Sequence, residues 1–213
     1  MENTIEMREY RTEDAASLEN IIRRTWHYDR FCSPKTAKRM AHLYLLNCLS
    51  RQTFTQVALR DGKPVGIIMG KDKQEKTSRR FAFPWLLAMI KMICSSESRK
   101  VLKIFSGFDT IDTDLLKEYG KEFKGELAFF AVDETCRGLG IGKMLFDRLV
   151  NYMDQQNIEN FYLYTDSSCN YGFYEHQGMV RCGKKDYSVP IGVENQMEFY
   201  LYEYRTENAK TAH

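Results

Sequence analysis

The sequence predicts an α/β domain in three layers, with helices on both faces of a mixed sheet. Two observations predict it. The N-terminal third has the order strand, helix, helix, strand, strand, and the half from Glu126 onward has the order strand, helix, strand, helix, strand, strand. Such alternation buries a sheet between helical layers. With 213 residues, 43% of them hydrophobic, the chain can build one substantial core. We therefore expect a single domain over residues 1–213.

The first predicted elements carry clear local signals. Residues 5–10 alternate apolar and polar side chains, which is typical of a strand. Thr12 can cap a helix that continues to Trp26. Ser33 and Pro34 mark the start of another helix, because proline fits the first helical turn. That helix is expected over 36–49, followed by strands at 54–60 and 64–70 with a hairpin turn at Asp61 and Gly62.

Residues 71–125 interrupt this pattern and are expected to form an insertion packed on the domain. Residues 71–80 are charged and have no apolar stripe, so they are predicted to be a solvated loop. Residues 84–93 are apolar helical material, and 110–123 are a more polar helical stretch. The apolar part has too much hydrophobic surface to stay in water, so we expect it to pack on the domain or on a second subunit.

The ordered pattern returns at residues 126–132, a nearly continuous apolar run that is typical of a strand covered on both faces. Helical periodicity follows over 142–156. The remaining expected elements are a strand at 161–166, a short helix at 169–177, and strands at 179–185 and 196–204.

Composition argues against several classes of protein. The formal net charge is +2, so we expect neither a nucleic acid nor a membrane as partner. The most apolar run, 81–94, contains Lys91 and is shorter than the roughly 20 residues of a membrane span. Cysteines and histidines are scattered without zinc-site spacing, so no metal is expected. The first residues lack the apolar core of a secretory signal. We expect a cytoplasmic monomer or homodimer.

The most informative segment is a glycine-rich turn between the strand at 126–132 and the helix after it. Alternate glycines let backbone N–H groups approach a ligand closely. The helix directs its first unpaired N–H groups and its positive dipole end at the turn. This combination predicts a cradle for an anion such as a pyrophosphate. The cradle comprises Arg137, Gly138, Leu139, Gly140, Ile141, Gly142 and Lys143.

The same turn has other possible interpretations. A phosphate-binding loop of the Walker type requires Ser or Thr after the lysine, whereas Met144 follows Lys143. A dinucleotide-binding fingerprint is partly matched, with Asp166 as its distant acidic residue, and stays open. A flexible turn without a ligand also stays open.

Residues 132–150 resemble the acetyl-CoA-binding motif of the GNAT family of N-acetyltransferases. That motif is an Arg or Gln, then a Gly three residues later, then a Gly or Ala two residues after that. Arg137, Gly140 and Gly142 meet it. Residues 173–179 resemble a second family element, F-Y-E-x-x-G-F, with Met179 in place of the last aromatic residue.

The resemblance implies a central sheet of about seven mostly antiparallel strands, with 71–125 inserted between the third and fourth. It also implies acetyl-CoA as co-substrate and direct transfer of the acetyl group, in a ternary complex, to a primary amine of a small molecule or peptide. The alternative is a non-catalytic acyl-CoA-binding module or sensor of the same fold.

The resemblance further implies cofactor contacts. Ala131 and Val132 would lie against the pantetheine arm, and their strand would supply a backbone N–H to the thioester carbonyl. Ser167 and Tyr174 are the remaining expected cofactor contacts.

Catalytic roles are implied for two residues. Tyr174 is the candidate general acid that protonates the departing thiolate, with Tyr171 and Tyr164 as alternatives. Glu126 is the candidate base acting through water, and an ordinary solvent-facing glutamate is the other interpretation of it.

The acceptor site would be walled by residues 26–38 and by the loop 183–196, with the insertion 71–125 shaping the pocket away from the cofactor. An acyl-enzyme formed by Cys169 with His176 is not expected, because seven residues separate them on the predicted short helix.

Overall fold

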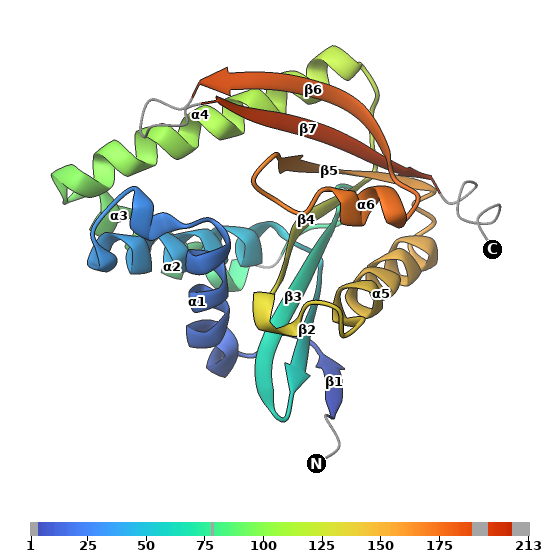
Figure 1. Cartoon of the computed structure of the whole chain (residues 1–213), viewed down its shortest axis with the longest axis horizontal. Coiled ribbons are helices and arrows are strands. Elements are labelled where there is room, and N and C mark those ends of the chain that lie inside the picture. Colours follow the sequence, from blue (N-terminus) through green and yellow to red (C-terminus); the bar gives the residue numbers. More distant parts are fainter. Residues whose placement is uncertain (1–3, 78, 189–195, 206–213) are drawn as a thin grey trace.

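The structure, a computed structural model, describes residues 4–77, 79–188 and 196–205. Its seven strands form one sheet in the order β1-β2-β3-β4-β5-β7-β6 (Figure 1). Every neighbouring pair is antiparallel except β4 and β5, so the expected mixed, mostly antiparallel sheet is confirmed. The strands are β1 (Ile5–Arg8), β2 (Phe54–Arg60), β3 (Lys63–Asp72), β4 (Gly125–Val132), β5 (Asn160–Asp166), β6 (Val180–Ser188) and β7 (Gln196–Arg205).

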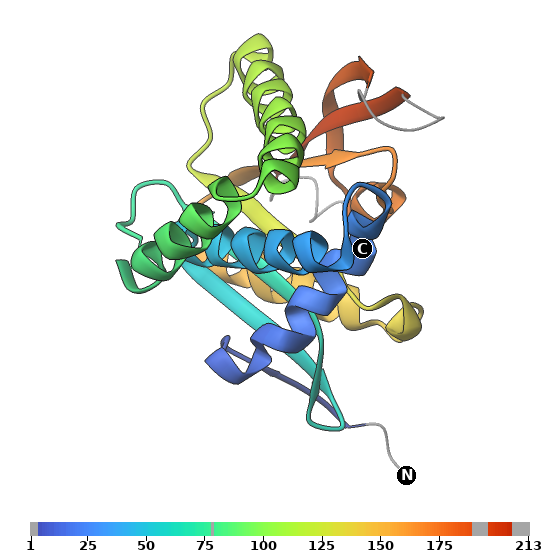
Figure 2. The same cartoon turned by 90° about the vertical axis from the view of Figure 1, so that its left-hand side faces the viewer.

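Six α-helices flank the sheet in the described parts of the chain. They are α1 (Ala15–Thr25), α2 (Pro34–Arg51), α3 (Ala82–Ile93), α4 (Ser96–Tyr119), α5 (Ile141–Gln155) and α6 (Gly172–His176). Figure 2 shows α1 and α2 lying across one face of the N-terminal strands. Helix α5 covers the other face (Figure 1). Within the described ranges, no helix is both long and apolar enough to cross a membrane.

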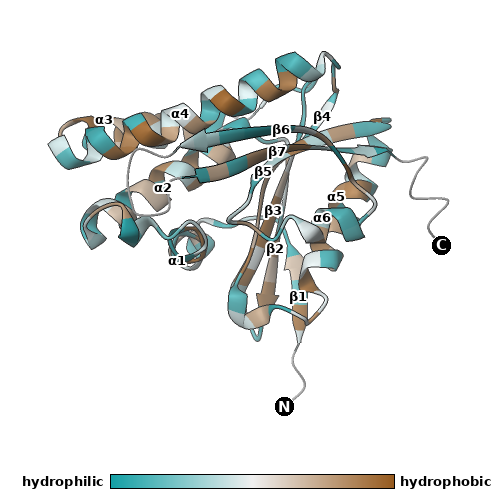
Figure 3. Ribbon diagram, turned by 45° about the horizontal axis from the view of Figure 1, so that its top comes forward, coloured by the Kyte–Doolittle hydropathy of each residue, from teal (hydrophilic) through white to brown (hydrophobic). Residues whose placement is uncertain are grey.

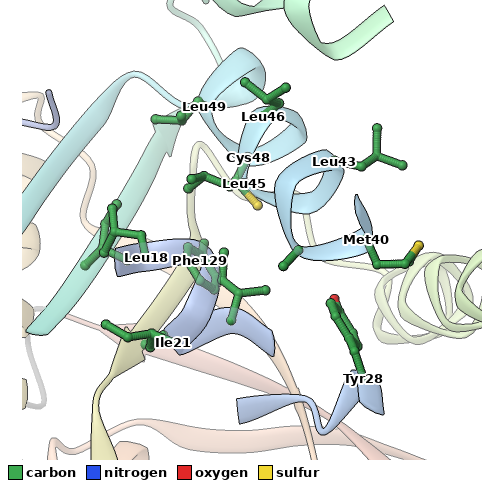
Figure 4. Packing of buried hydrophobic residues seen from close by; sticks show 14 of the residues in the cluster. Leu18, Ile21, Tyr28, Met40, Leu43, Leu45, Leu46, Cys48, Leu49 and Phe129 are labelled. Atoms are coloured by element: carbon green, nitrogen blue, oxygen red, sulfur yellow. The ribbon is translucent and has the colours of Figure 1, made fainter. Parts of the chain in front are cut away.

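Each face of the sheet has its own core. On one face, Leu18 and Ile21 of α1 and Leu45 of α2 pack against Phe129 of β4 (Figure 4). On the other face, Leu145, Phe146 and Leu149 of α5 pack against buried residues of β4 and β5. Strand β4 therefore lies at the centre of the molecule, covered on both sides as its apolar run predicts.

The insertion differs from its prediction in two respects. Strand β3 continues to Asp72, and Lys71 and Asp72 pair with Glu126 and Gly125, so the loop predicted for 71–80 begins two residues later. Helix α4 spans 24 residues, Ser96–Tyr119, although a helical stretch was predicted only over 110–123. The Ser95 hydroxyl caps the helix by accepting from the Ser98 N–H (3.4 Å), and the left-handed Gly120 (φ 70°) ends it.

The insertion contributes directly to the core. Ala88 and Met92 of α3 and Val101 of α4 belong to the same core cluster as α1 and α2. Further along α4, Ile111 and Leu115 pack on Phe199 and Leu201 of β7. Removal of both helices would thus expose apolar surface of α2 and β7 to water.

The neighbouring strands β4 and β5 separate along their length and leave part of the β4 backbone unpaired. Strands β4 and β5 pair only at Gly125 with Phe161 and at Glu126 with Tyr162. Beyond those pairs they diverge, while β4 stays paired with β3 as far as Val132. The backbone edge of β4 that faces β5 is therefore left open, because its N–H and C=O groups have no strand partner there.

Candidate active site

A cavity of about 550 Å³ lies where the open edge of β4 reaches the start of α5. Its walls come from the α1–α2 connection, the end of β4, the glycine-rich turn and the segment that leads into α6. The lining residues are Ile21, Arg24, Thr25, Trp26, His27, Phe130, Ala131, Val132, Asp133, Glu134, Cys136, Arg137, Gly138, Gly140, Ile141, Gly142, Lys143, Ser168, Cys169, Asn170, Phe173 and Tyr174.

The glycine-rich turn has the conformation that an anion cradle requires. Gly138 and Gly140 have φ values of 79° and 75°, in the region that favours glycine. Helix α5 begins at Ile141, so its first N–H groups and its positive dipole end face the turn. A Cβ built on Gly138 or Gly140 meets no protein atom within 4 Å. The space beside both glycines is thus open to a ligand.

Gly142 has a different environment. It is helical, and a Cβ there would meet the ring of Phe173 at 3.4 Å and that of Phe130 at 3.6 Å. These are ordinary van der Waals distances, so alanine fits at this position but a larger side chain would displace Phe173. Gly142 therefore brings α5 close to the apolar floor of the cavity.

Tyr174 lies in the cavity wall, beside β4. Only 9% of its surface is exposed, and its ring is 6.4 Å from that of Phe130. Burial, with smaller effects of Cys169 and Asp166, raises the pKa of the Tyr174 phenol well above its ordinary value. The phenol is therefore protonated at neutral pH. In the described parts of the chain, no group forms a hydrogen bond with its hydroxyl, which leaves the proton available to a bound molecule.

Glu126 lies at the other end of β4, where the strands meet. Six residues separate it from Val132, roughly 20 Å along an extended strand. The pairing of β3 with β4 skips Ala128, since Met69 pairs with Phe129 and Gly70 with Leu127. This β-bulge reverses the alternation of side chains. Glu126 consequently lies on the α2 side of the sheet, near Cys48 of α2. Burial raises the pKa of the Cys48 thiol, and the Glu126 charge adds to that rise.

Helix α4 adds carboxylates to that side. Burial raises the pKa of Asp112, and the nearby negative charges of Asp109, Asp166 and Glu126 raise it further. Burial also raises the pKa of Asp109, and the positive charge of Arg51 partly opposes that rise. The Asp112 Oδ1 atom is buried, and it accepts no hydrogen bond from the described residues. Tyr162 and Tyr164 of β5 also border this region. Burial is the main cause that raises the pKa of both phenols, and the nearby Glu126 charge adds to the rise. An acidic, tyrosine-lined wall thus stands beside Glu126.

Two residues that line the cavity, from distant parts of the chain, form an ion pair. Arg24 of α1 forms an ion pair with Asp133, the residue after β4. Asp133 also accepts hydrogen bonds from the Thr135 N–H (3.0 Å) and hydroxyl (2.8 Å). These bonds lower the pKa of Asp133 and keep it ionised. The ring of Trp26 lies 5.5 Å from that of Phe129.

The acyl-enzyme alternative finds no support in this geometry. Cys169 precedes α6 rather than lying on it, and its Sγ donates to Asp166 Oδ2 at 3.7 Å. Burial raises the pKa of the Cys169 thiol to about 11. His176 Nδ1 contacts the Gly172 carbonyl at 2.6 Å instead. Cys169 is therefore a neutral thiol, and His176 does not act as its base.

Comparison with models of known protein families gives a match that includes the glycine-rich turn. The model of the acetyltransferase (GNAT) family matches residues 16–179. This span holds the glycine-rich turn, the open edge of β4 and α6. The chain belongs to the GNAT family.

Solved structures share the GNAT fold of this chain. The PH1933 protein of Pyrococcus horikoshii OT3 is 16% identical, with 95% of this chain and 99% of that chain covered and a TM-score of 0.61. A ribosomal-protein-alanine N-acetyltransferase of Brucella melitensis is 15% identical (94% and 99% covered, TM-score 0.55). Ard1 of Thermoplasma volcanium is 17% identical (94% and 97%, TM-score 0.51). No curated protein matches the chain.

Two of the predicted cofactor contacts do not line the cavity of this GNAT protein. Ser167 bonds to β7 instead, where its Oγ accepts from the Glu198 N–H at 3.1 Å. Leu139 is 47% exposed and is not among the lining residues. The other predicted contacts, from Ala131 to Lys143 and Tyr174, are brought together. Lys143 forms an ion pair with Asp147 at 2.7 Å.

Sequence reasoning missed several lining residues. Arg24 and Thr25 come from the end of α1, and Ser168 and Asn170 from the turn before α6. Trp26 and His27 belong to the predicted acceptor wall 26–38, and both line the cavity. The other predicted acceptor wall, 183–196, lies outside the described residues over 189–195. In the described portion, no three His, Cys, Asp or Glu side chains gather as a metal site.

The raised pKa of Asp112 gives a prediction about stability. Burial, with the nearby charges of Asp109, Asp166 and Glu126, raises the pKa of Asp112 from 3.8 to about 7. The folded state therefore binds more protons than the unfolded chain between these values. This group lowers stability as pH rises through that window, after which the loss is constant.

Asp112→Asn, which cannot ionise, is expected to raise the free energy of unfolding by about 2 kcal/mol at pH 8 and by little near pH 4. Urea unfolding at both pH values measures it. Asp114→Asn, a more exposed carboxylate of α4, is the control. Equal effects of Asp112→Asn at the two pH values would show that its charge is not penalised.

Proposed function

We propose that this GNAT protein is an N-acetyltransferase that moves an acetyl group from acetyl-CoA to a primary amine of a small molecule or peptide. The proposal rests on one observation above all: the anion cradle of 137–143 and the open edge of β4 form a continuous surface. The cradle suits the pyrophosphate of acetyl-CoA. The open edge suits the pantetheine amides, which need backbone partners that a paired strand could not offer.

The residues divide the chemical tasks as follows. Backbone N–H groups of Gly138 to Lys143 hold the pyrophosphate, and Arg137 adds a positive charge. Ala131 and Val132 lie along the pantetheine arm, and a backbone N–H on the same strand polarises the thioester carbonyl. The amine nitrogen attacks the carbonyl carbon, the carbon–sulfur bond breaks, and Tyr174 donates its proton to the thiolate.

The acceptor must lose a proton before or during attack, because an ammonium ion has no lone pair. Glu126 is the proposed base. Its distance from the Tyr174 end of β4 requires that it act through water. The carboxylates around Asp112 favour an acceptor that arrives as a cation. Helix α4 of the insertion thereby shapes the acceptor side, and none of the described residues of the insertion lines the cofactor cavity.

Direct transfer in a ternary complex is proposed rather than an acyl-enzyme, since Cys169 is a neutral thiol that His176 does not contact. The expected kinetic result is a set of intersecting, not parallel, double-reciprocal lines when acetyl-CoA and amine are varied together.

Activity is tested by incubating the protein with acetyl-CoA and a panel of amines, including diamines and peptides with a free N-terminus. Release of free CoA thiol and the mass of the acetylated product are both measured. Turnover of at least one amine supports the enzyme. Tight CoA binding in calorimetry without turnover of any amine would instead support the non-catalytic acyl-CoA-binding module.

A further inference from the structure

Helix α3 is apolar on two opposite sides. Its inner side packs on the core through the buried Ala88 and Met92. Its outer side exposes five large hydrophobic residues: Phe83 (67%), Leu86 (46%), Leu87 (43%), Ile90 (49%) and Ile93 (50%). A helix that is apolar all round is ordinarily covered all round. The outer side therefore lacks a covering surface within the described protein.

These residues form one continuous stripe. Their spacing of three and four places them within a third of the helix circumference, on the side away from Ala88 and Met92. Figure 3 shows α3 at one end of the molecule, next to the beginning of α4. No residue of α3 lines the cofactor cavity. The stripe is therefore an outward surface separate from the active site.

Basic residues are frequent in α3 and in the segments directly before and after it. Between residues 76 and 103 there are seven basic residues, all exposed: Lys76, Arg79, Arg80, Lys91, Arg99, Lys100 and Lys103. Lys91 lies on α3 itself, at the margin of the stripe, and Arg99 donates to the Ile93 carbonyl at 2.7 Å.

The carboxylate of Glu97, the single acidic residue in the same segment, is held against the start of α2. It accepts hydrogen bonds from the Ser33 N–H and hydroxyl, both at 2.8 Å, and from the Thr36 hydroxyl of α2. The chain as a whole is nearly neutral, with a net charge of +2. Its remainder is therefore net acidic, and the excess positive charge is concentrated around the α3 stripe.

We propose that the outer side of α3 docks on an anionic lipid bilayer. The apolar side chains would enter the boundary between headgroups and acyl chains, and the surrounding Lys and Arg side chains would face lipid phosphates. Charge decides against a second copy of the chain as the occupant. Two stripes brought together about a twofold axis would place their basic residues side by side, and these would repel. Docking leaves the cavity entrance clear of α3.

Co-sedimentation with vesicles tests the proposal. The full-length protein is mixed with vesicles of phosphatidylcholine alone or of phosphatidylcholine with phosphatidylserine. We expect the protein to bind the anionic vesicles. Its affinity for the neutral vesicles should be at least about tenfold lower, and 1 M salt should weaken binding to the anionic vesicles by a similar factor.

Matched variants separate the contribution of the apolar stripe to vesicle binding from that of the basic residues. Leu86→Ser/Ile90→Ser removes apolar area from the outer side without touching the core, and Lys91→Glu/Lys100→Glu reverses two charges. Both are expected to lose vesicle binding at least about tenfold while circular dichroism and CoA affinity stay unchanged. Val180→Ser, at an exposed hydrophobic residue of β6 (53%), is the control and should bind vesicles as the wild type does.

Three results would overturn the proposal. The first is a wild-type protein that does not bind anionic vesicles. The second is a Leu86→Ser/Ile90→Ser variant that binds them normally. The third is a lipid-free dimer in sedimentation velocity that this variant abolishes, which would assign the stripe to a second copy of the chain.

Discussion

Tyr174→Phe is expected to lower kcat by between about 10²- and 10⁴-fold while CoA affinity and the fold are retained. The substitution removes the phenolic proton donor and keeps the ring between Phe130 and Tyr202. Packing changes little because none of the described groups forms a hydrogen bond with the lost hydroxyl. Steady-state rates on any accepted amine, with CoA titration by calorimetry, measure both quantities.

Tyr171→Phe is the matched control, since Tyr171 lies on the same segment but packs on Tyr200 (5.1 Å) and does not line the cavity. The Tyr171→Phe variant should have the kcat of the wild type. If Tyr174→Phe retains wild-type kcat, the proton comes from elsewhere. A loss in Tyr171→Phe or Tyr164→Phe would then move the role to that residue, and normal rates in all three would leave water as the donor.

Gly140→Val is expected to weaken CoA binding by at least about 10²-fold. A side chain at this position occupies the open space beside the turn, where the pyrophosphate approaches the backbone N–H groups. The same substitution also strains a backbone with φ of 75°, so loss of binding alone could reflect a distorted turn.

Gly62→Val separates the two effects. Gly62, in the turn between β2 and β3, has φ of 76°, and a Cβ at this position would likewise meet no atom within 4 Å. The two variants should lose similar stability, yet only Gly140→Val should lose CoA binding in calorimetry. Gly142→Ala, which fits beside Phe173, should bind nearly as the wild type. Undiminished CoA affinity in a folded Gly140→Val protein would show that this turn is not the cradle.

The cofactor half of the site was largely predictable because its determinants are local. The alternate glycines, the strand before them and the helix after them are contiguous between residues 126 and 156. Backbone conformation and the first N–H groups of a helix follow from such neighbouring residues. The same holds for α6 and Tyr174, whose motif spans 173–179.

The limits of the local signals are equally specific. The sequence of α4 has Ser95 before it and Gly120 after it, and these ends match the observed helix. Its first half also has apolar residues at helical spacing, Val101, Ile104, Phe105 and Phe108, a local signal that the prediction of a helix over 110–123 left out. Lys71 and Asp72 are polar, yet they extend β3 because Glu126 and Gly125 offer them a strand partner. For β3, therefore, a distant segment decided where the strand ends.

By itself, the sequence of this GNAT protein determined the order of its strands and helices and the position of its glycine-rich turn. Only the tertiary structure decided the side that we propose for the acceptor. It brought Arg24 to Asp133, which is 109 residues away, and Asp112 of α4 to Glu126 of β4. It also placed the β-bulge at Ala128 that turns Glu126 toward α2. These arrangements depend on strand register and helix packing between distant segments, which no run of neighbouring residues encodes.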